Sequence, residues 1–156
     1  MGASETDSRP AFNIRRASGD DAGALAEMAQ AFHAEDGHPL SDVGLKAVLA
    51  MLEPDFDQGV ILILDVDAEI AGYGILGFGY GVEHGGRETF VEDIFVKSAW
   101  RNRGYGAVLL EALEAHARHA GCKAVLLEVM PNNPAERLYR RVGYGDRGSL
   151  LMKKVL

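Results

Sequence analysis

The chain has 156 residues, of which 47% are hydrophobic and 25% are charged, and its formal net charge is -7. This length suits one compact domain, and the negative field disfavours a nucleic-acid partner while favouring a cationic ligand such as an amine. No apolar run approaches the roughly 20 residues of a membrane span, and the single cysteine, Cys122, cannot form an internal disulfide, so we expect a cytoplasmic protein without a membrane partner.

The N-terminal part of the chain is expected to form one strand and two helices. Residues 1–9 are polar and lack the apolar core of a signal peptide, which predicts a flexible tail before a single domain at residues 10–156. A short strand at residues 12–16 precedes a helix that starts at Ser18, and Ser41 caps a second helix. The apolar stripes of these helices are Leu25, Met28, Ala29 and Phe32 in the first and Leu45, Val48, Leu49 and Leu52 in the second.

The middle of the chain is rich in leucine and β-branched residues. Residues 60–66 and 70–80 are predicted to pair as a hairpin, and the polar residues 82–88 connect them to a strand at residues 90–96. A helix over residues 104–120 follows, and a glycine directly after it is typical of a helix end.

The last part of the chain alternates strand and helix. A strand at residues 124–129 leads to a helix with Asn133 as its cap and Pro134 in its first position. A final strand at residues 150–156 completes the order β-α-α-β-β-β-α-β-α-β. This order predicts an α/β fold with a mixed sheet.

One glycine motif has a competing interpretation. The segment Gly72-Tyr73-Gly74-Ile75-Leu76-Gly77 matches the G-x-G-x-x-G fingerprint of dinucleotide-binding proteins, and Glu92 lies about 20 residues downstream, where such proteins hold a ribose. The fingerprint needs a helix that opens on the glycines, whereas here glycine alternation continues to Gly81. The apolar phase also shifts after Ile75, which suits a bulge or a strand covered on both faces. We interpret the segment as a strand and keep a nucleotide-binding oxidoreductase as a minor alternative.

A loop with two glycines lies between a predicted strand and a predicted helix. Its sequence is Arg101-Asn102-Arg103-Gly104-Tyr105-Gly106. A helix N-terminus offers unpaired N–H groups and a partial positive charge, and glycines let a phosphate approach closely, so this order predicts an anion site. Arg101 and Arg103 would add charge-assisted hydrogen bonds. The alternative is an ordinary glycine-rich turn with surface arginines.

Two motifs carry a family resemblance. The pattern Arg101-x-x-Gly104-x-Gly106, after a strand that ends in Ile94-Phe95-Val96, resembles the acyl-CoA loop of the GNAT superfamily of N-acetyltransferases. The pattern Asn132-x-x-Ala135-x-x-x-Tyr139-x-x-x-Gly143-Tyr144 resembles the later motif of the same superfamily. The similarity covers residues 60–156, and the strand around Glu92 is similar to that of the diamine acetyltransferase subgroup.

This resemblance implies a sheet that splays between the strands at residues 90–96 and 124–129, with the pantetheine arm of acetyl-CoA against the first strand. The pyrophosphate is expected on residues 101–106, and Asn132 or Asn133 near the cofactor, although Asn133 suits a helix cap better. The resemblance also implies a homodimer. The expected cofactor-binding residues are Ile94, Phe95, Val96, Arg101, Asn102, Arg103, Gly104, Tyr105, Gly106, Asn132 and Asn133.

Two side chains are expected to move protons. The resemblance implies that Tyr139 protonates the thiolate of CoA as it leaves, whereas the alternative is a packing tyrosine. Leu138 and Val142 are expected to form the buried stripe of this helix, which leaves Tyr139 free to point elsewhere. An alkyl ammonium with a pKa near 10.4 lies about 3.4 units above pH 7, so its neutral form costs roughly 4.6 kcal/mol. Glu92, directly or through a water, is the expected proton acceptor.

The expected reaction is direct transfer of an acetyl group from acetyl-CoA to a primary amine of a small molecule or peptide. The oxyanion of the tetrahedral intermediate would meet a backbone N–H near Phe95 or Val96. A catalytically silent acyl-CoA-binding module, which makes no use of Tyr139, is the alternative.

The amine is expected to enter between residues 33–41 and residues 82–88. The acidic residues expected to bind it are Asp93, Glu35, Asp36 and Glu83. No metal is needed for this chemistry, and His116 and His119, which have the spacing of metal ligands on a helix, lack a third ligand in the sequence.

Overall fold

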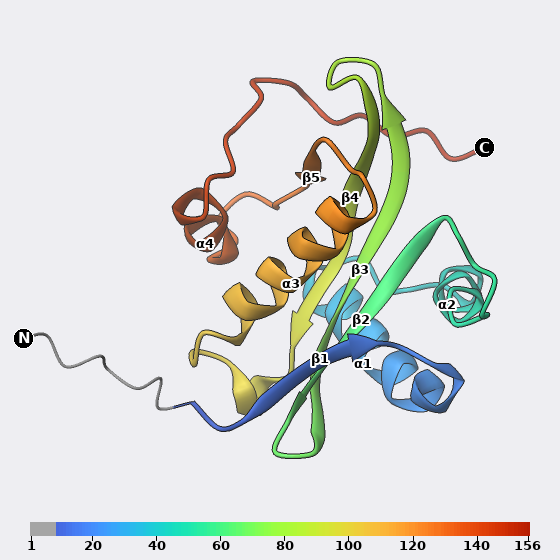
Figure 1. Ribbon diagram of the computed structural model, residues 1–156, viewed down its shortest axis with the longest axis vertical. Helices are drawn as coiled ribbons and strands as arrows, with labels where there is room; N and C mark the ends of the chain where they lie inside the picture. Colours follow the sequence, from blue (N-terminus) through green and yellow to red (C-terminus); the bar gives the residue numbers. More distant parts are fainter. Residues whose placement is uncertain (1–8) are drawn as a thin grey trace, which may run out of the picture.

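The computed structural model describes residues 9–156, which contain a five-stranded sheet in the order β1-β2-β3-β4-β5 (Figure 1). The strands are β1 (Phe12–Arg16), β2 (Gly59–Val66), β3 (Glu69–Gly81), β4 (Gly86–Val96) and β5 (Val125–Leu127), and the α-helices are α1 (Ala22–Glu35), α2 (Asp42–Ala50), α3 (Tyr105–His119) and α4 (Ala135–Arg141). Neighbouring strands are antiparallel except β4 and β5, which are parallel. This mixed sheet confirms the predicted fold class. The predicted tail at residues 1–9 lies outside the described residues, apart from Arg9.

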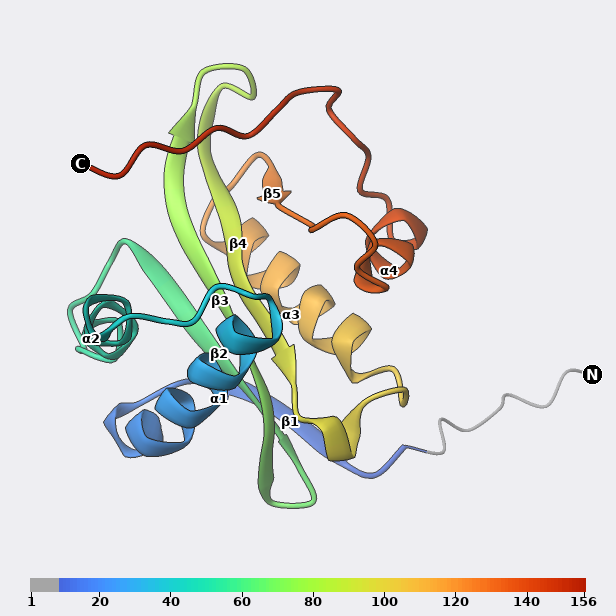
Figure 2. The same cartoon turned by 180° about the vertical axis from the view of Figure 1, so that it is seen from behind.

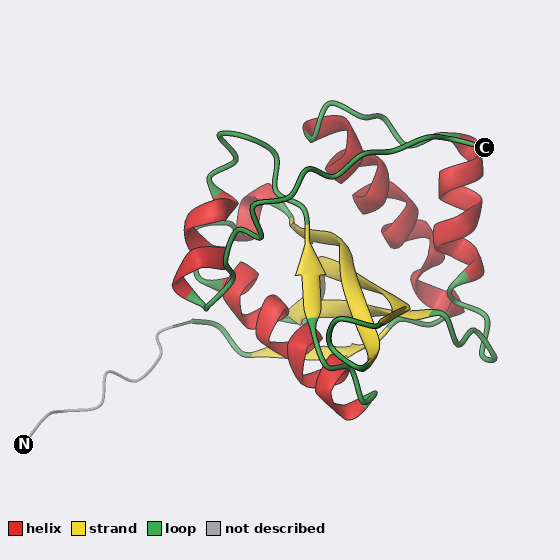
Figure 3. Cartoon of the chain, turned by 90° about the horizontal axis from the view of Figure 1, so that it is seen from above, coloured by secondary structure: helices red, strands yellow, loops and turns green. Residues whose placement is uncertain are grey.

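Helices cover both faces of the sheet. α3 lies in front of the sheet in Figure 1, whereas α1 and α2 lie in front of it in the reverse view of Figure 2. The view from above in Figure 3 shows the two helical layers with the strands between them. One core, on the α1 and α2 face, includes Leu25, Met28, Ile61, Ile63, Tyr73, Ile75 and Phe95. The other core, on the α3 face, includes Leu62, Leu64, Leu76, Val91, Leu109, Leu110, Leu113 and Tyr139.

The glycine motif of residues 72–77 lies within β3, and no helix opens on it, so its interpretation as a strand is confirmed. A Cβ atom on Gly72 would collide with the carbonyl oxygen of Phe95, and one on Gly74 would lie 2.7 Å from a methyl group of Leu113. Close packing therefore accounts for these two glycines. β3 has an apolar core on each face, which explains why its apolar residues do not alternate simply.

Two strand boundaries differ from the prediction by more than one residue. β4 begins at Gly86 rather than at Phe90, because the polar residues that follow the hairpin turn also pair with β3. β5 covers residues 125–127 rather than 124–129, because it diverges from β4 after three paired residues. None of the helices within residues 9–156 is long and apolar enough to cross a membrane.

The predicted strand at residues 150–156 is wrong. These residues are exposed and have no regular secondary structure. Arg147 donates a 2.8 Å hydrogen bond to Glu83 at the tip of the β3–β4 hairpin, so the chain crosses this hairpin and runs away from β5 (Figure 2). The short β5 also offers little edge for another strand to pair with.

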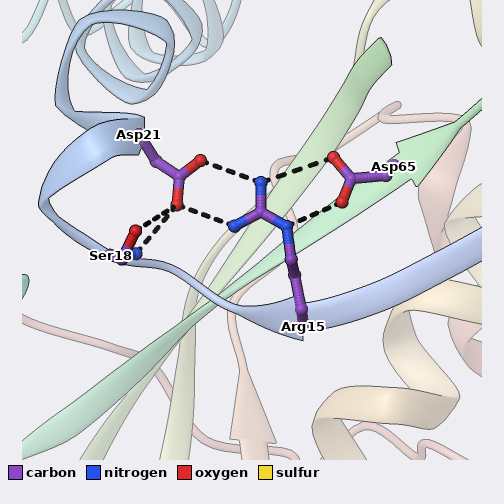
Figure 4. A network of polar contacts seen from close by, with 4 residues as sticks. All are labelled: Arg15, Ser18, Asp21 and Asp65. Atoms are coloured by element: carbon purple, nitrogen blue, oxygen red, sulfur yellow. Dashed lines mark hydrogen bonds and ion pairs between the residues drawn. The ribbon is translucent and has the colours of Figure 1, made fainter. Parts of the chain in front are cut away.

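An ion-pair network fixes β1 to the start of the first helix (Figure 4). Arg15 donates to both carboxylate oxygens of Asp21 at 2.8 and 2.9 Å and to Asp65 of β2 at 2.7 Å. The backbone N–H of Ser18 donates to Asp21 at 2.8 Å, which confirms the predicted helix start; a 3-10 turn at Gly19–Asp21 precedes α1. The hydrogen bonds from Arg15 lower the pKa of the buried Asp21. The network thereby holds α1 against the sheet.

Candidate active site

β4 and β5 separate beyond a short region of pairing. Their parallel register covers only residues 89–91 of β4 and 125–127 of β5, whereas β4 continues to Val96 paired with β3 alone. The N–H of Lys97 donates to the carbonyl of Ala71 in β3 at 2.8 Å. Because successive residues of a strand direct their backbone groups to opposite edges, those of Ile94 and Val96 point into the gap beside β4.

The predicted anion site forms the start of α3. Gly104 has a φ of 83° and stands directly before the helix, and Asn102 has a φ of 59°. The N–H of Val108 makes the first helical hydrogen bond, to the carbonyl of Gly104, at 3.2 Å. The N–H groups of the residues between them therefore have no partner within the helix and can bind an anion.

The side chains of this loop have separate roles. Arg103 lies over the ring of Trp100, with 5.3 Å from its guanidinium carbon to the ring centre, and remains exposed. Tyr105 is buried, and its hydroxyl donates to the carbonyl of Pro10 at 3.4 Å. A phosphate can thus reach the backbone of Tyr105, whereas its phenol supports the loop from within the core.

Arg101 connects the two halves of the site. Its Nη2 lies 3.0 and 2.9 Å from the two carboxylate oxygens of Glu35 at the end of α1, and its Nε donates to the carbonyl of Val96 at 2.7 Å. The guanidinium also covers the ring of Phe95 at 5.2 Å. The structure thus brings together two predicted site residues, and in this arrangement each neutralises the charge of the other.

A bulge in β4 places two acidic residues on the same face of the sheet. Ile75 of β3 pairs with Asp93 and the next residue, Leu76, pairs with Val91, so Glu92 is the extra residue. A Cβ atom on Gly77, which shares a face with Ile75, would lie 3.1 Å from Oε1 of Glu92. Glu92 and Asp93 therefore both face α1, although consecutive strand residues normally face opposite sides.

Asp93 has two partners within the protein. The hydroxyl of Tyr73 donates to its Oδ2 at 2.7 Å, and Nε2 of His33 on α1 lies 3.2 Å from the same oxygen. Asp93 is only 4% exposed, and burial raises its pKa while Tyr73 and His33 oppose the rise. Neither partner follows from the sequence, because the contact depends on the bulge and on the path of α1.

Glu92 lies beside this buried group and remains exposed. Desolvation by the surrounding strands, followed by repulsion from Asp93, raises the pKa of Glu92, and the charge of His33 opposes the rise. The charge of Asp36 acts on Asp93, so Asp36 is also near the cluster. Glu83 lies far from the cluster, because it pairs with Arg147 at the tip of the β3–β4 hairpin. Even the start of β4 is six residues, or about 20 Å of strand, from Glu92.

α4 presents Tyr139 to the core. The expectation that Leu138 and Val142 form its buried stripe is wrong for Val142, which is 44% exposed, whereas Tyr139 is 8% exposed and packs on Tyr144 with 6.0 Å between ring centres. Seven residues are too few for the helical period to define the inward face of α4.

The hydroxyl of Tyr139 makes no hydrogen bond within residues 9–156. No fully buried side-chain oxygen or nitrogen in that range lacks a partner, so this hydroxyl is not fully buried. Burial raises the pKa of Tyr139, which keeps the phenol protonated. Such a group can donate a proton.

The two asparagines before α4 differ. Oδ1 of Asn133 accepts a hydrogen bond from the N–H of Ala135 at 2.9 Å, so its side chain satisfies an N–H group at the start of α4 as predicted, although Pro134 rather than Asn133 directly precedes the helix. Asn132 has a φ of 66° and is exposed. In the part of the chain that the structure describes, no group of three His, Cys, Asp or Glu side chains could hold a metal ion.

Known proteins resemble this chain over most of its length. A sequence model of the acetyltransferase (GNAT) family matches residues 25–144. The thialysine N-epsilon-acetyltransferase of Bos taurus is 29% identical over 143 residues, which cover 85% of this chain and 84% of that protein. An integron cassette protein from the mobile metagenome of Cole Harbour Salt Marsh has a similar structure, with a TM-score of 0.78 and 30% identity over 92% of this chain and 90% of that chain. The aminoglycoside N-acetyltransferase AAC(6')-Iy, solved in complex with CoA, shares the fold with a TM-score of 0.78 and 17% identity, over 93% of this chain and 95% of that chain.

Proposed function

Because the chain belongs to the GNAT family of acetyltransferases and is an acyl-CoA-dependent N-acetyltransferase, we propose that it transfers the acetyl group of acetyl-CoA directly to a primary amine of a small molecule or peptide. The observation that carries the proposal is the gap beside β4. Along this edge β4 runs from Glu92, whose carboxylate faces α1, to Val96, and the loop before α3 follows in sequence. A thioester in the gap would meet an amine held at this carboxylate.

In this proposal acetyl-CoA approaches along the free edge of β4. The pyrophosphate binds the unpaired N–H groups at the start of α3, where the helix dipole favours an anion. The pantetheine arm follows the edge, where the backbone groups of Ile94 and Val96 point away from β3. The oxyanion then meets the N–H of Val96 rather than that of Phe95, since Phe95 directs its backbone to β3.

Glu92 and Tyr139 divide the proton transfers. Glu92 accepts a proton from the ammonium group of the amine. The raised pKa of Glu92 is closer to the pKa of that ammonium than the pKa of an ordinary glutamate is, which favours this transfer. Tyr139 keeps its proton at neutral pH because burial raises its pKa, and it donates that proton to the sulfur of CoA. The two side chains belong to opposite faces of the sheet, so the reacting atoms lie between them in the gap.

A panel of primary amines tests the proposal. The purified protein is incubated with acetyl-CoA and each amine, and the release of CoA thiol is measured. We expect release with at least one amine, and a fall of kcat by about 100-fold in Glu92→Gln and in Tyr139→Phe. Binding of acetyl-CoA without thiol release for any amine would instead support the silent binding module.

We also propose a homodimer in the cytoplasm. The apolar side chains of residues 150–156 support the dimer, because Leu150, Met152 and Val155 are each 82% exposed in a single chain. Within residues 9–156, the short β5 forms one end of the sheet and pairs only with β4. A second copy could cover both features. Light scattering with and without residues 150–156 tests this assembly, and a monomer in both cases contradicts it.

A further inference from the structure

The cluster beside Glu92 contains a histidine that links a buried carboxylate to solvent. His33 lies in the last turn of α1, and its side chain is 27% exposed, whereas that of Asp93 is 4% exposed. Nε2 of His33 lies 3.2 Å from Oδ2 of Asp93, which also accepts the 2.7 Å hydrogen bond from Tyr73. This arrangement holds the imidazole in place from its buried side.

Acetyl transfer to an ammonium releases one net proton. The substrates R-NH3+ and acetyl-CoA give R-NH-acetyl, CoA-SH and H+, so two protons leave the nitrogen. One proton is balanced by the proton that the sulfur receives, and the other must reach solvent. Glu92, once protonated, must lose this proton before it can act again. A neighbouring group with access to solvent would complete the path.

We propose that His33 takes this proton from Glu92, directly or through a water, and releases it to solvent, while Asp93 and Tyr73 act as positioning residues for the imidazole. This step rests on the proposed function. Because an ionised Asp93 only accepts hydrogen bonds, Nε2 carries the N–H and Nδ1 carries the lone pair that accepts the proton. The imidazolium then loses the proton from Nδ1 to water, and no other bond changes.

The bulge supports this step, because it places Glu92 directly beside Asp93 on the face of the sheet that His33 of α1 contacts. The charge of His33 lowers the pKa of both Glu92 and Asp93, so the imidazole interacts with each carboxylate. The charged and titratable groups around His33 are Glu92 and Asp93 of β4, Tyr73 of β3 and Asp36 after α1. Glu35, on the same helix as His33, is instead paired with Arg101. A buried carboxylate that holds a partly exposed imidazole is suited to proton transfer.

The test compares histidine variants of the full chain in the thiol-release assay, with the amine that the wild type acetylates fastest. In His33→Gln the amide can still contact Asp93 but cannot carry the proton. We expect kcat to fall by at least 10-fold, with the KM for acetyl-CoA unchanged. In His33→Ala we expect a similar loss that added imidazole reverses in proportion to its concentration. His119→Gln is the matched control, because His119 is exposed at the end of α3, on the other face of the sheet; we expect wild-type kcat.

Two results overturn the proposal for His33. One is a pH profile of kcat in His33→Gln that coincides with that of the wild type. The other is a loss in His33→Ala that does not respond to imidazole, because free base cannot restore a purely structural role. The imidazole titration is run below the unfolding temperature of the variant, so reduced stability does not affect the outcome. If the wild type acetylates none of the amines, the proposed function fails and the His33 step fails with it. A coincident pH profile or an absence of rescue by imidazole overturns only the His33 step and leaves the proposed function standing.

Discussion

Gly77 determines where the carboxylate of Glu92 can lie, which gives a direct test of the proposed base. A Cβ atom on Gly77 would lie 3.1 Å from Oε1 and 3.5 Å from Cγ of Glu92. Relaxed carbon contacts lie at about 3.5–4.0 Å, so Gly77→Ala pushes the carboxylate away by a few tenths of an ångström. A misplacement of about 1 Å in an active site can lower the rate about 100-fold, so we expect kcat to fall about 3- to 10-fold.

The matched control is Gly79→Ala, on the same strand and the same face. A Cβ atom at Gly79 meets nothing within 4 Å, so we expect unchanged kcat. Thiol release is measured at saturating acetyl-CoA and amine, and the KM for acetyl-CoA should not change in either variant. Equal kcat values for the two variants would refute this reasoning. So would a full additional loss when Gly77→Ala is combined with Glu92→Gln, because the effect would then not depend on the carboxylate.

Three further predictions concern pH, the cofactor loop and stability. Because the pKa of Glu92 is raised, kcat should begin to fall on acidification at a higher pH than it would with an ordinary glutamate as base. Glu92→Gln should remove this decline; its persistence would assign the decline to another group. Gly104→Ala forces a left-handed backbone on alanine, which costs roughly 1 kcal/mol, so we expect about a 5-fold higher KM for acetyl-CoA at similar kcat, and an unchanged KM would contradict the loop assignment. Asp21→Asn should cost about 2 kcal/mol at pH 7 and lower Tm by about 4–8 °C. Since the pKa of Asp21 is lowered by folding, its stabilisation is complete above about pH 4 and is lost on further acidification, so thermal unfolding should show the two proteins converging at low pH.

Much of the fold follows from local sequence signals. Strand and helix order up to α4, the start of α1 near Ser18 and the side-chain hydrogen bond of Asn133 depend on residues close together in the chain, and the structure agrees with each. The glycine loop was also predictable, since a strand, two glycines and a helix occur in sequence order. The last strand was not, because its pairing depends on a partner edge that local composition does not describe.

The contacts that shape the site depend on residues far apart in the sequence. Arg101 and Glu35 are separated by 66 positions, and both were predicted for the site, but nothing in either segment indicates that they pair. The link between His33 and Asp93 spans 60 positions and requires α1 to end over β4. Sequence periodicity describes the faces of one element, whereas these contacts depend on how two elements are packed.

The bulge at Glu92 joins these observations into one mechanism. A regular strand would turn Glu92 and Asp93 to opposite faces, and the two carboxylates would then interact weakly. The extra residue instead places both on the α1 face, where the charge of Asp93 raises the pKa of Glu92 and where His33 contacts Asp93. Because its pKa is raised, Glu92 is better matched to an amine than an ordinary glutamate would be. Asp93 is already hydrogen-bonded to Tyr73 and His33, so in the proposed mechanism it positions the histidine and does not bind the amine. We therefore propose that Glu92 and Asp36, rather than Asp93, bind the ammonium group of the amine.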